Sequence, residues 1–441
     1  MSKKFKVKTA DLRCICDHRV FKFKNTSEIK PLNEVIGQKR AVQAIDFGLN
    51  MKSPGYNIFV TGIEGTGKST IVKDIVTKHA KTLPGPDGWC LVNNFKDQFR
   101  PKAIAVSSGK VVQFSKTVNQ LIEDLKKDLP AAFESKPYLK RLSAIKKRYS
   151  VRQNQLFQKI EKFAADKHLK IVKSENEFET IPVVDGKPLT TEDFTNLSKR
   201  KKTEIEENIR LIQSQIAIAS VEVDKLTSAL HADVEKLMDE TTLSVVKSRL
   251  EKIRSEFQDN RDILTHLAEV EQDIVENVNL FMPSEETSTG GENILASPQN
   301  SKLQRYRVNI LTHQESIMGA PVIFESNPTY HNVMGRIEKR AYMGTVTTDF
   351  TMVQAGSLLN ANGGFLIMDM ESVLMNPYVW EALKRTLQTK CLYIEDITEE
   401  TGFGTVSLQP APIPLDVKVI LLGSYDNFEV LQNHDPVSYT H

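Results

Sequence analysis

The sequence contains few cysteines, few aromatic residues and no long apolar run. Four cysteines in 441 residues are too few for a disulfide framework, and aromatic residues make up only 7%. No stretch approaches the ~18 consecutive apolar residues that span a bilayer. The basic N-terminus is not followed by the apolar segment of a signal peptide. We therefore predict a cytoplasmic protein that has no membrane partner.

The sequence also lacks an excess of charge of one sign. Its 58 Lys and Arg residues are balanced by 56 Asp and Glu residues, for a net charge of +2. Nothing in this balance predicts nucleic acid as an obligatory partner, although contact with DNA is left open. Cys14, Cys16 and His18 lie close together but lack the spacing and the second ligand pair of a zinc site. We predict a structural role for them.

Hydrophobic periodicity predicts an α/β domain that is interrupted by a long helical insertion. A helix is expected over 34–51, and apolar strands are expected at 56–60 and 89–92. The α/β pattern returns after a polar linker, with strands at 306–311, 321–324, 364–369 and 417–423. We assign an N-terminal segment (1–30), the first half of the domain (31–110), the insertion with a small β element near 168–190 (111–282), the linker (283–302), the second half (303–436) and a non-native tail (437–441).

The most regular periodicity lies inside the insertion. Apolar residues alternate spacings of four and three, which is the pattern of a coiled-coil seam: Ile205, Ile209, Ile212, Ile216, Ala219, Val223, Leu226 and Leu230. A second helical run continues from Leu250 to Val278. Two long helices that join between Asp239 and Thr242 would form an antiparallel hairpin, and an ordinary bundle is an equal alternative.

A glycine-rich motif follows the first apolar strand and precedes a helix. Residues 62–69 match G-x-x-x-x-G-K-[ST] at every fixed position. In this motif the backbone N–H groups and the helix N-terminus bind phosphates, the lysine reaches the β- and γ-phosphates, and the serine coordinates Mg²⁺. We predict an ATP and Mg²⁺ site made by Gly62, Ile63, Glu64, Gly65, Thr66, Gly67, Lys68, Ser69 and Thr70.

A second strand ends in an acid, as the partner of a P-loop does. Residues 365–369 are apolar up to Asp369, which we predict to hold Mg²⁺ through water. The next residue is Met370, where hydrolysing AAA+ proteins usually carry a catalytic Glu. If the strand continued, Glu371 would share a side with Asp369, and it is the candidate base. Ser424 or Asn427, at the end of the last strand, would sense the γ-phosphate, with a simple surface turn as the alternative.

These motifs together resemble those of the bacterial Lon-like ATP-dependent proteases. Four stretches carry the resemblance: Val35–Ala41, Ser53–Val60, Asn327–Tyr330 and Gly356–Gly364, the last leading into the Asp369 strand. The resemblance covers almost all of residues 10–435. It implies a P-loop AAA+ fold and a homo-hexameric ring that threads protein substrates by ATP-driven motion.

The resemblance also implies roles for individual residues. Ile36 and Gly37, with Gln38, would line the adenine pocket, and Tyr342 and Met343 would form the pore loop that grips substrate, with a plain turn as the alternative. One of Arg336, Arg340 and Arg385 would act on the neighbouring subunit's nucleotide. The Ser/Lys proteolytic domain of the family would lie beyond residue 441.

Other classes of protein share part of this pattern. Chromosome-organising and DNA-repair ATPases also place a coil between P-loop and acidic strand, but they carry a Ser-Gly-Gly signature where this chain has Asn360 to Gly364. A non-proteolytic AAA+ remodeller remains an alternative. A nucleotide-binding pseudo-ATPase is a further one, because of Met370. A GTPase is disfavoured, since no Asn-Lys-x-Asp motif occurs.

Overall fold

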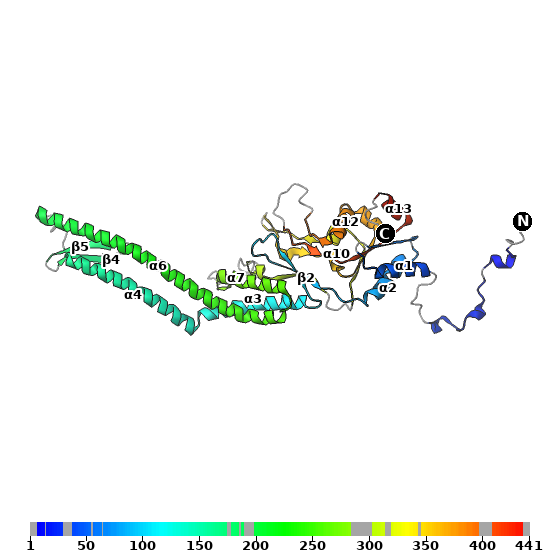
Figure 1. Ribbon diagram of the computed structural model, residues 1–441, viewed down its shortest axis with the longest axis horizontal. Coiled ribbons are helices and arrows are strands. Elements are labelled where there is room, and N and C mark those ends of the chain that lie inside the picture. The colour runs from blue at the N-terminus through cyan, green and yellow to red at the C-terminus, as the bar shows by residue number, and fades with distance from the viewer. Residues whose placement is uncertain are drawn as a thin grey trace.

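The computed structural model describes most of the chain. The described residues are 7–13, 15–29, 38–53, 56–63, 65–173, 178–184, 187–188, 198–283, 302–313, 319–342, 345–396 and 408–434. An α/β body lies between two projections: a long helical rod on one side and the N-terminal segment on the other (Figure 1). None of the described helices is both long and apolar enough to cross a membrane.

The body is built on a four-stranded parallel sheet in the order β1-β16-β13-β8. Its strands are β1 (Ile58–Thr61), β8 (Val322–Glu325), β13 (Phe365–Asp369) and β16 (Lys418–Gly423). The two central strands, β13 and β16, are almost continuously apolar and buried, as expected for parallel strands that are covered on both faces. The predicted α/β fold with a parallel sheet is therefore confirmed.

Helices cover both faces of this sheet. On one face lie α1 (Lys39–Asn50) and α2 (Lys68–Ala80), whose buried residues pack against Ile367 and Ile420. On the other face Leu366 and Leu421 pack against residues of four helices. These helices are α9 (Tyr330–Met334), α10 (Ser357–Asn360), α11 (Met370–Met375) and α12 (Val379–Thr389). Helix α13 (Tyr425–His434) follows β16.

A second sheet joins the body to the insertion. Strands β2 (Gly88–Val92), β3 (Lys102–Val106) and β7 (Val308–Thr312) form an antiparallel sheet in the order β3-β2-β7. Shorter pairs complete the body: β9 (Arg336–Ile337) with β12 (Val353–Gln354), β10 (Arg340–Tyr342) with β11 (Thr345–Thr347), and β14 (Cys391–Leu392) with β15 (Ile413–Pro414). Single 3-10 turns occur at Val278–Phe281, Gln304–Tyr306 and Phe350–Met352.

The described residues of the insertion form four helices and a small antiparallel sheet. The helices are α3 (Val111–Phe133), α4 (Lys136–Asp166), α6 (Lys199–Glu256) and α7 (Arg261–Glu276). The sheet contains β4 (Leu169–Lys173), β5 (Phe178–Val184) and β6 (Lys187–Pro188), near the predicted position.

The predicted joint at Asp239–Thr242 is wrong, because α6 continues unbroken through it. No glycine or proline interrupts that stretch, and the helix ends only before Asn260, whose side chain caps α7.

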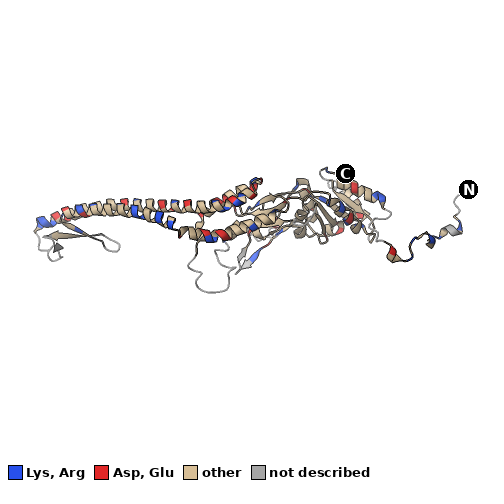
Figure 2. Ribbon diagram, turned by 90° about the horizontal axis from the view of Figure 1, so that it is seen from below, with Lys and Arg blue, Asp and Glu red and all other residues tan. Residues whose placement is uncertain are grey.

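The antiparallel partner of α6 is α4. Arg141 contacts Glu240 at 2.7 Å, and Tyr149 donates to Asp233 at 2.8 Å, so residue numbers fall on α6 as they rise on α4. The predicted seam faces this partner, and Ile212 in it is fully buried. The C-terminal part of α6 packs instead with α3 and α7 in a bundle. Figure 2 shows acidic and basic residues interspersed along the rod formed by α4 and α6.

Candidate functional site

The P-loop lies at the carboxyl edge of the parallel sheet. Thr61 is paired with Gly423 and Asp369 with Leu422, so β1, β16 and β13 end side by side. Ligands of open α/β sheets bind outside this edge. The edge therefore brings together the P-loop, Asp369 and Ser424, which are far apart in the sequence.

The loop's backbone depends on two glycines. Gly65 and Gly67 have φ angles of 77° and 81°, in the left-handed region that favours glycine. A Cβ atom at either position would meet nothing within 4 Å, so the requirement is conformational rather than steric. Gly67 precedes α2, and the first amides of a helix have no partners within it. The chain thus directs free N–H groups and the helix dipole toward one point, which suits a phosphate.

Lys68 connects the loop to the end of β16. Its Nζ donates to the carbonyl oxygen of Gly62 and, at 3.0 Å, to that of Gly423. The side chain is half-buried and lies over the loop. Gly423 allows Phe59 and Met370 to pack closely against the end of β16, because a Cβ there would lie 2.8 Å from the Phe59 ring and 3.3 Å from the Met370 Cβ. Gly423 is not among the site residues predicted from the sequence, although a glycine that ends an apolar strand is a signal of close approach.

The carboxylate of Asp369 is anchored at the end of β13. Its Oδ1 accepts hydrogen bonds from the backbone N–H and the hydroxyl of Ser372, both at 2.9 Å, and so caps α11. Side chains of β13 alternate between the two faces, and Asp369 shares the face of Ile367, which α2 covers. Carboxylate and hydroxyl oxygens are suitable Mg²⁺ ligands. Asp369, together with Ser69 in the first turn of α2, therefore fits the donor set that Mg²⁺ requires.

Met370 and Glu371 lie in a helix rather than on a strand. Strand β13 ends at Asp369 and α11 begins at Met370, so the expected alternation, with Glu371 on the side of Asp369, is wrong. Met370 is fully buried in the core beneath the sheet, whereas Glu371 is exposed in the first helical turn. The side chain that follows Asp369 is therefore part of the hydrophobic core in this chain, and a carboxylate at that position would point into the core.

The remaining predicted residues are distributed over the same body. The Ser424 hydroxyl accepts a bond from the Asn427 N–H at 3.1 Å, which places both at the start of α13. Ile36, Gly37, Glu64 and Met343 lie outside the described residues. Tyr342 ends β10 opposite Thr345, at the tip of the β10–β11 hairpin.

The three candidate trans-acting arginines lie near that hairpin or on α12. Arg336 is 3.1 Å from Glu338, and Arg385 is 3.2 Å from Glu395. Arg340 is exposed at the start of β10. Both ion pairs are exposed and therefore weak, so they do not select among the three candidates.

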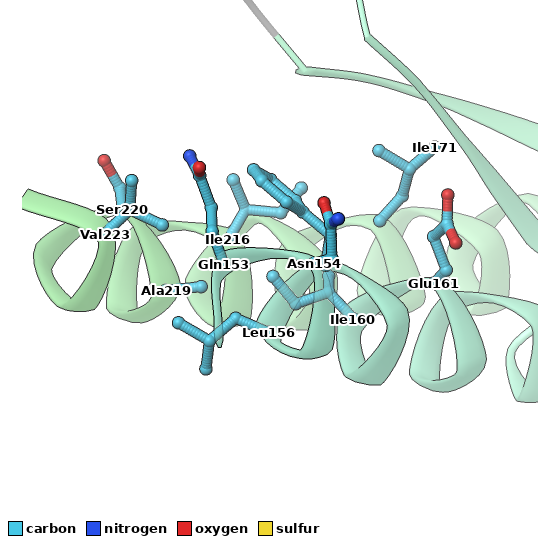
Figure 3. A pocket seen from close by; sticks show the side chains of 11 residues that line it. Gln153, Asn154, Leu156, Ile160, Glu161, Ile171, Ile216, Ala219, Ser220 and Val223 are labelled. Carbon is cyan, nitrogen blue, oxygen red and sulfur yellow. The ribbon is translucent and has the colours of Figure 1, made fainter. Parts of the chain in front are cut away.

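A groove of about 380 Å³ lies far from this edge, between α4 and α6 of the rod (Figure 3). The side chains of Leu156 and Ile160 from α4 approach those of Ile216 and Ala219 from α6, with Ile171 of β4 beside them. Glu161 is the one charged group among the described residues that line it. The other polar side chains that line the groove are the uncharged Gln153, Asn154 and Ser220.

A P-loop after one strand of a parallel sheet, with an acid at the end of the next strand but one, is typical of a nucleotide-binding module of the AAA+ class. Residues 318–439 match the family model of a LonB-like AAA domain, and residues 89–121 match that of a Lon-like LonC helical domain. The two matches support the predicted resemblance to the AAA+ portion of the Lon-like protease family. The first match includes Asp369 and Ser424, while the P-loop lies outside both matches. No curated protein matches the chain.

Proposed function

We propose that this module binds and hydrolyses ATP to unfold and translocate protein substrates as part of a Lon-like serine protease. The main support for this proposal is that the P-loop, Lys68 and Asp369 lie at the same edge of the parallel sheet. On this proposal the chain forms a homo-hexamer, the β10–β11 hairpin supplies the pore loop, and a Ser/Lys domain outside these 441 residues cleaves the substrate. We also propose that the domains have the boundaries predicted from the sequence.

On this proposal each predicted residue has a defined task. The P-loop amides hold the phosphates, and Lys68 exchanges its carbonyl partners for the β- and γ-phosphates. Ile36 and Gly37, which lie outside the described residues, would hold the adenine. Mg²⁺, held by Ser69 and Asp369, supplies charge neutralisation on the phosphates. Ser424, which follows β16, would sense the γ-phosphate. Glu371 would orient the attacking water and accept its proton, because it is the exposed acid nearest to Asp369 in sequence.

Binding of labelled ATP by the full chain tests the phosphate site. Lys68→Ala is expected to reduce affinity at least tenfold while the melting temperature stays unchanged. Lys73→Ala is the matched control, since Lys73 is an exposed lysine on the same helix. Equal affinities in wild type and Lys68→Ala would refute the site.

The buried Met370 favours a second candidate, a pseudo-ATPase that binds nucleotide as a structural ligand. Steady-state ATP turnover separates the two functions. If Glu371 is the base, Glu371→Gln reduces turnover at least a hundredfold while ATP binding persists. Absence of turnover in wild type, with ATP binding intact, would favour the pseudo-ATPase.

A further inference from the structure

The N-terminal arm, residues 7–29, exposes an unusual amount of apolar surface. Leu12, Ile15 and Val20 are 72%, 75% and 73% exposed. Every residue of the arm whose burial is described is exposed. The large apolar side chains that the arm presents to solvent are Val7, Leu12, Ile15, Val20, Phe21, Phe23 and Ile29. Apolar residues gathered in this way mark contact with another macromolecule.

The arm has local structure of its own. It forms 3-10 turns at Thr9–Leu12, His18–Val20 and Thr26–Glu28. Asp17 Oδ1 accepts from the Arg19 N–H at 3.0 Å, and Asn25 Oδ1 accepts from the Ser27 N–H at 3.1 Å. These bonds satisfy backbone groups but bury no apolar side chain. The turns of the arm are therefore held by local hydrogen bonds, while its apolar side chains remain exposed to solvent in the single copy.

The body also exposes an apolar patch, at the end of α11 and in the turn before α12. In this 374–378 patch Leu374, Met375 and Tyr378 are 43%, 73% and 63% exposed. Tyr378 has a φ of 68°, which is costly for a residue with a large side chain. Such conformations persist where the surrounding structure requires them, and they cluster at functional surfaces. The strained turn holds an aromatic ring out to solvent.

The arm is basic, and the charged residues that flank the patch within 370–381 are acidic. The arm contains five Lys and Arg against three Asp and Glu, and residues 1–6 and 30 add four Lys, whereas residues 370–381 contain Glu371 and Glu381 and no Lys or Arg. The Glu381 carboxylate stays 76% exposed although Lys384 lies 2.8 Å from it. Complementary charges steer association and fix its orientation.

We propose that the arm of one copy docks on the 374–378 patch of a second copy of this chain. In its own copy the arm projects away from the body (Figure 1). At ~3.3 Å per residue an arm of this length reaches up to roughly 75 Å, which is enough to cross a neighbouring body. Burial of its seven apolar side chains would cover several hundred Å², near the ~800 Å² per partner of a specific interface. A head-to-tail contact of this kind can close into a ring.

Cross-linking of two distinguishable full-length copies tests the contact directly. Both copies carry Cys14→Ser and Cys391→Ser, and Cys90 is unreactive because burial raises the pKa of its thiol to about 12. One copy keeps Cys16, which is exposed in the arm. The other carries Cys16→Ser and Met375→Cys. A short bis-maleimide should join the two copies at least tenfold more efficiently than when the second copy carries Val151→Cys, a rod position 46% exposed.

Equal yields from Met375→Cys and Val151→Cys would overturn the proposal. So would a cross-link that forms only within one chain when Cys16 and Met375→Cys are combined in it. Repeating the experiment with Lys68→Ala in both copies separates this inference from the proposed nucleotide site. Docking needs no bound nucleotide, so the yield should persist when ATP binding is lost.

Sedimentation of the full chain gives an independent test. Ile15→Ser, Val20→Ser and Phe21→Ser combined should weaken self-association at least tenfold without lowering the melting temperature, because these side chains are uncovered in the single copy. The matched control combines Leu211→Ser, Ile218→Ser and Val221→Ser on α6, at positions 51%, 54% and 54% exposed. Unchanged association in the arm variant, or a wild-type chain that stays monomeric at all concentrations, would refute the docking.

Discussion

The body and the rod achieve burial in different ways. In the body, Leu366, Ile367 and Met368 are successive residues of β13, and each is fully buried because helices cover both faces of the sheet. In the rod, α4 and α6 cover each other along a single seam. Ile212 is buried there, but Ile216 and Val223 are only half-buried. A side chain in the body therefore contributes more to folding free energy than an equivalent one in the rod.

The largest effect on the free energy of unfolding is expected at Met370, which is buried in the core directly after Asp369. Met370→Glu would place a carboxylate in the core of the body, with an expected loss of at least ~3 kcal/mol in the free energy of unfolding. Met370→Leu keeps volume and polarity and should cost less than ~1.5 kcal/mol. Urea unfolding of both variants gives the comparison. A Met370→Glu chain as stable as Met370→Leu would mean that the side chain reaches solvent at the nucleotide edge.

The same truncation in both regions measures their difference directly. Ile367→Ala in β13 should cost roughly 3–4 kcal/mol, since it leaves a cavity among buried neighbours. Ile216→Ala in the rod should cost about 1 kcal/mol, because its site is half-buried and open to the groove. Denaturant titrations followed by circular dichroism check both values. Equal losses would show that the rod seam packs as tightly as the sheet.

The sequence predicted the body well because its elements carry local signals. The P-loop follows a strand and starts a helix, and residues 365–369 are apolar up to an acid; both appear where the pattern put them. The seam from Ile205 to Leu230 likewise predicted a buried helix face. Periodicity states that a face is buried but not which element buries it. The partner of α6 is α4, which is separated from it in the chain by the small β4–β6 sheet.

The candidate site was predictable only in part for a similar reason. Asp369 and Lys68 follow from motifs, but the place where β13 ends is decided by tertiary structure. Asp369 caps α11 through Ser372, which turns the chain and sends Met370 into the core. A strand pattern alone did not predict that Glu371 lies in the first turn of a helix. The contact of Lys68 with the Gly423 carbonyl joins residues 355 positions apart, and no local signal specifies it.

A buried histidine in the bundle that joins rod and body should make its stability pH-dependent. Burial, with a smaller contribution from the charge of Lys102, lowers the pKa of His266 to about 3. Below its ordinary pKa of ~6.5 the unfolded chain binds a proton that the folded chain does not. Stability is therefore complete above pH 6.5 and falls as the pH drops, by about 2 kcal/mol between pH 7 and pH 5.

The non-titrating variant His266→Leu isolates this contribution. Its unfolding free energy should change about 2 kcal/mol less than that of wild type over the same pH interval, measured by urea titration at each pH. The stacking of His266 on Phe95, at 5.9 Å between ring centroids, should make the variant less stable at pH 7, but it does not affect the slope. Identical slopes would mean that water reaches the imidazole in the folded chain.

The smallest effect on the free energy of unfolding is expected for the ion pairs between α4 and α6. Arg141 lies 2.7 Å from Glu240, but their side chains are 60% and 47% exposed. Water and salt screen such pairs, so Arg141→Ala should lower the free energy of unfolding by no more than ~0.5 kcal/mol. The double variant with Glu240→Ala gives the coupling energy between the two. A coupling above ~1 kcal/mol would show that charge, rather than the apolar seam, sets the register of α4 on α6.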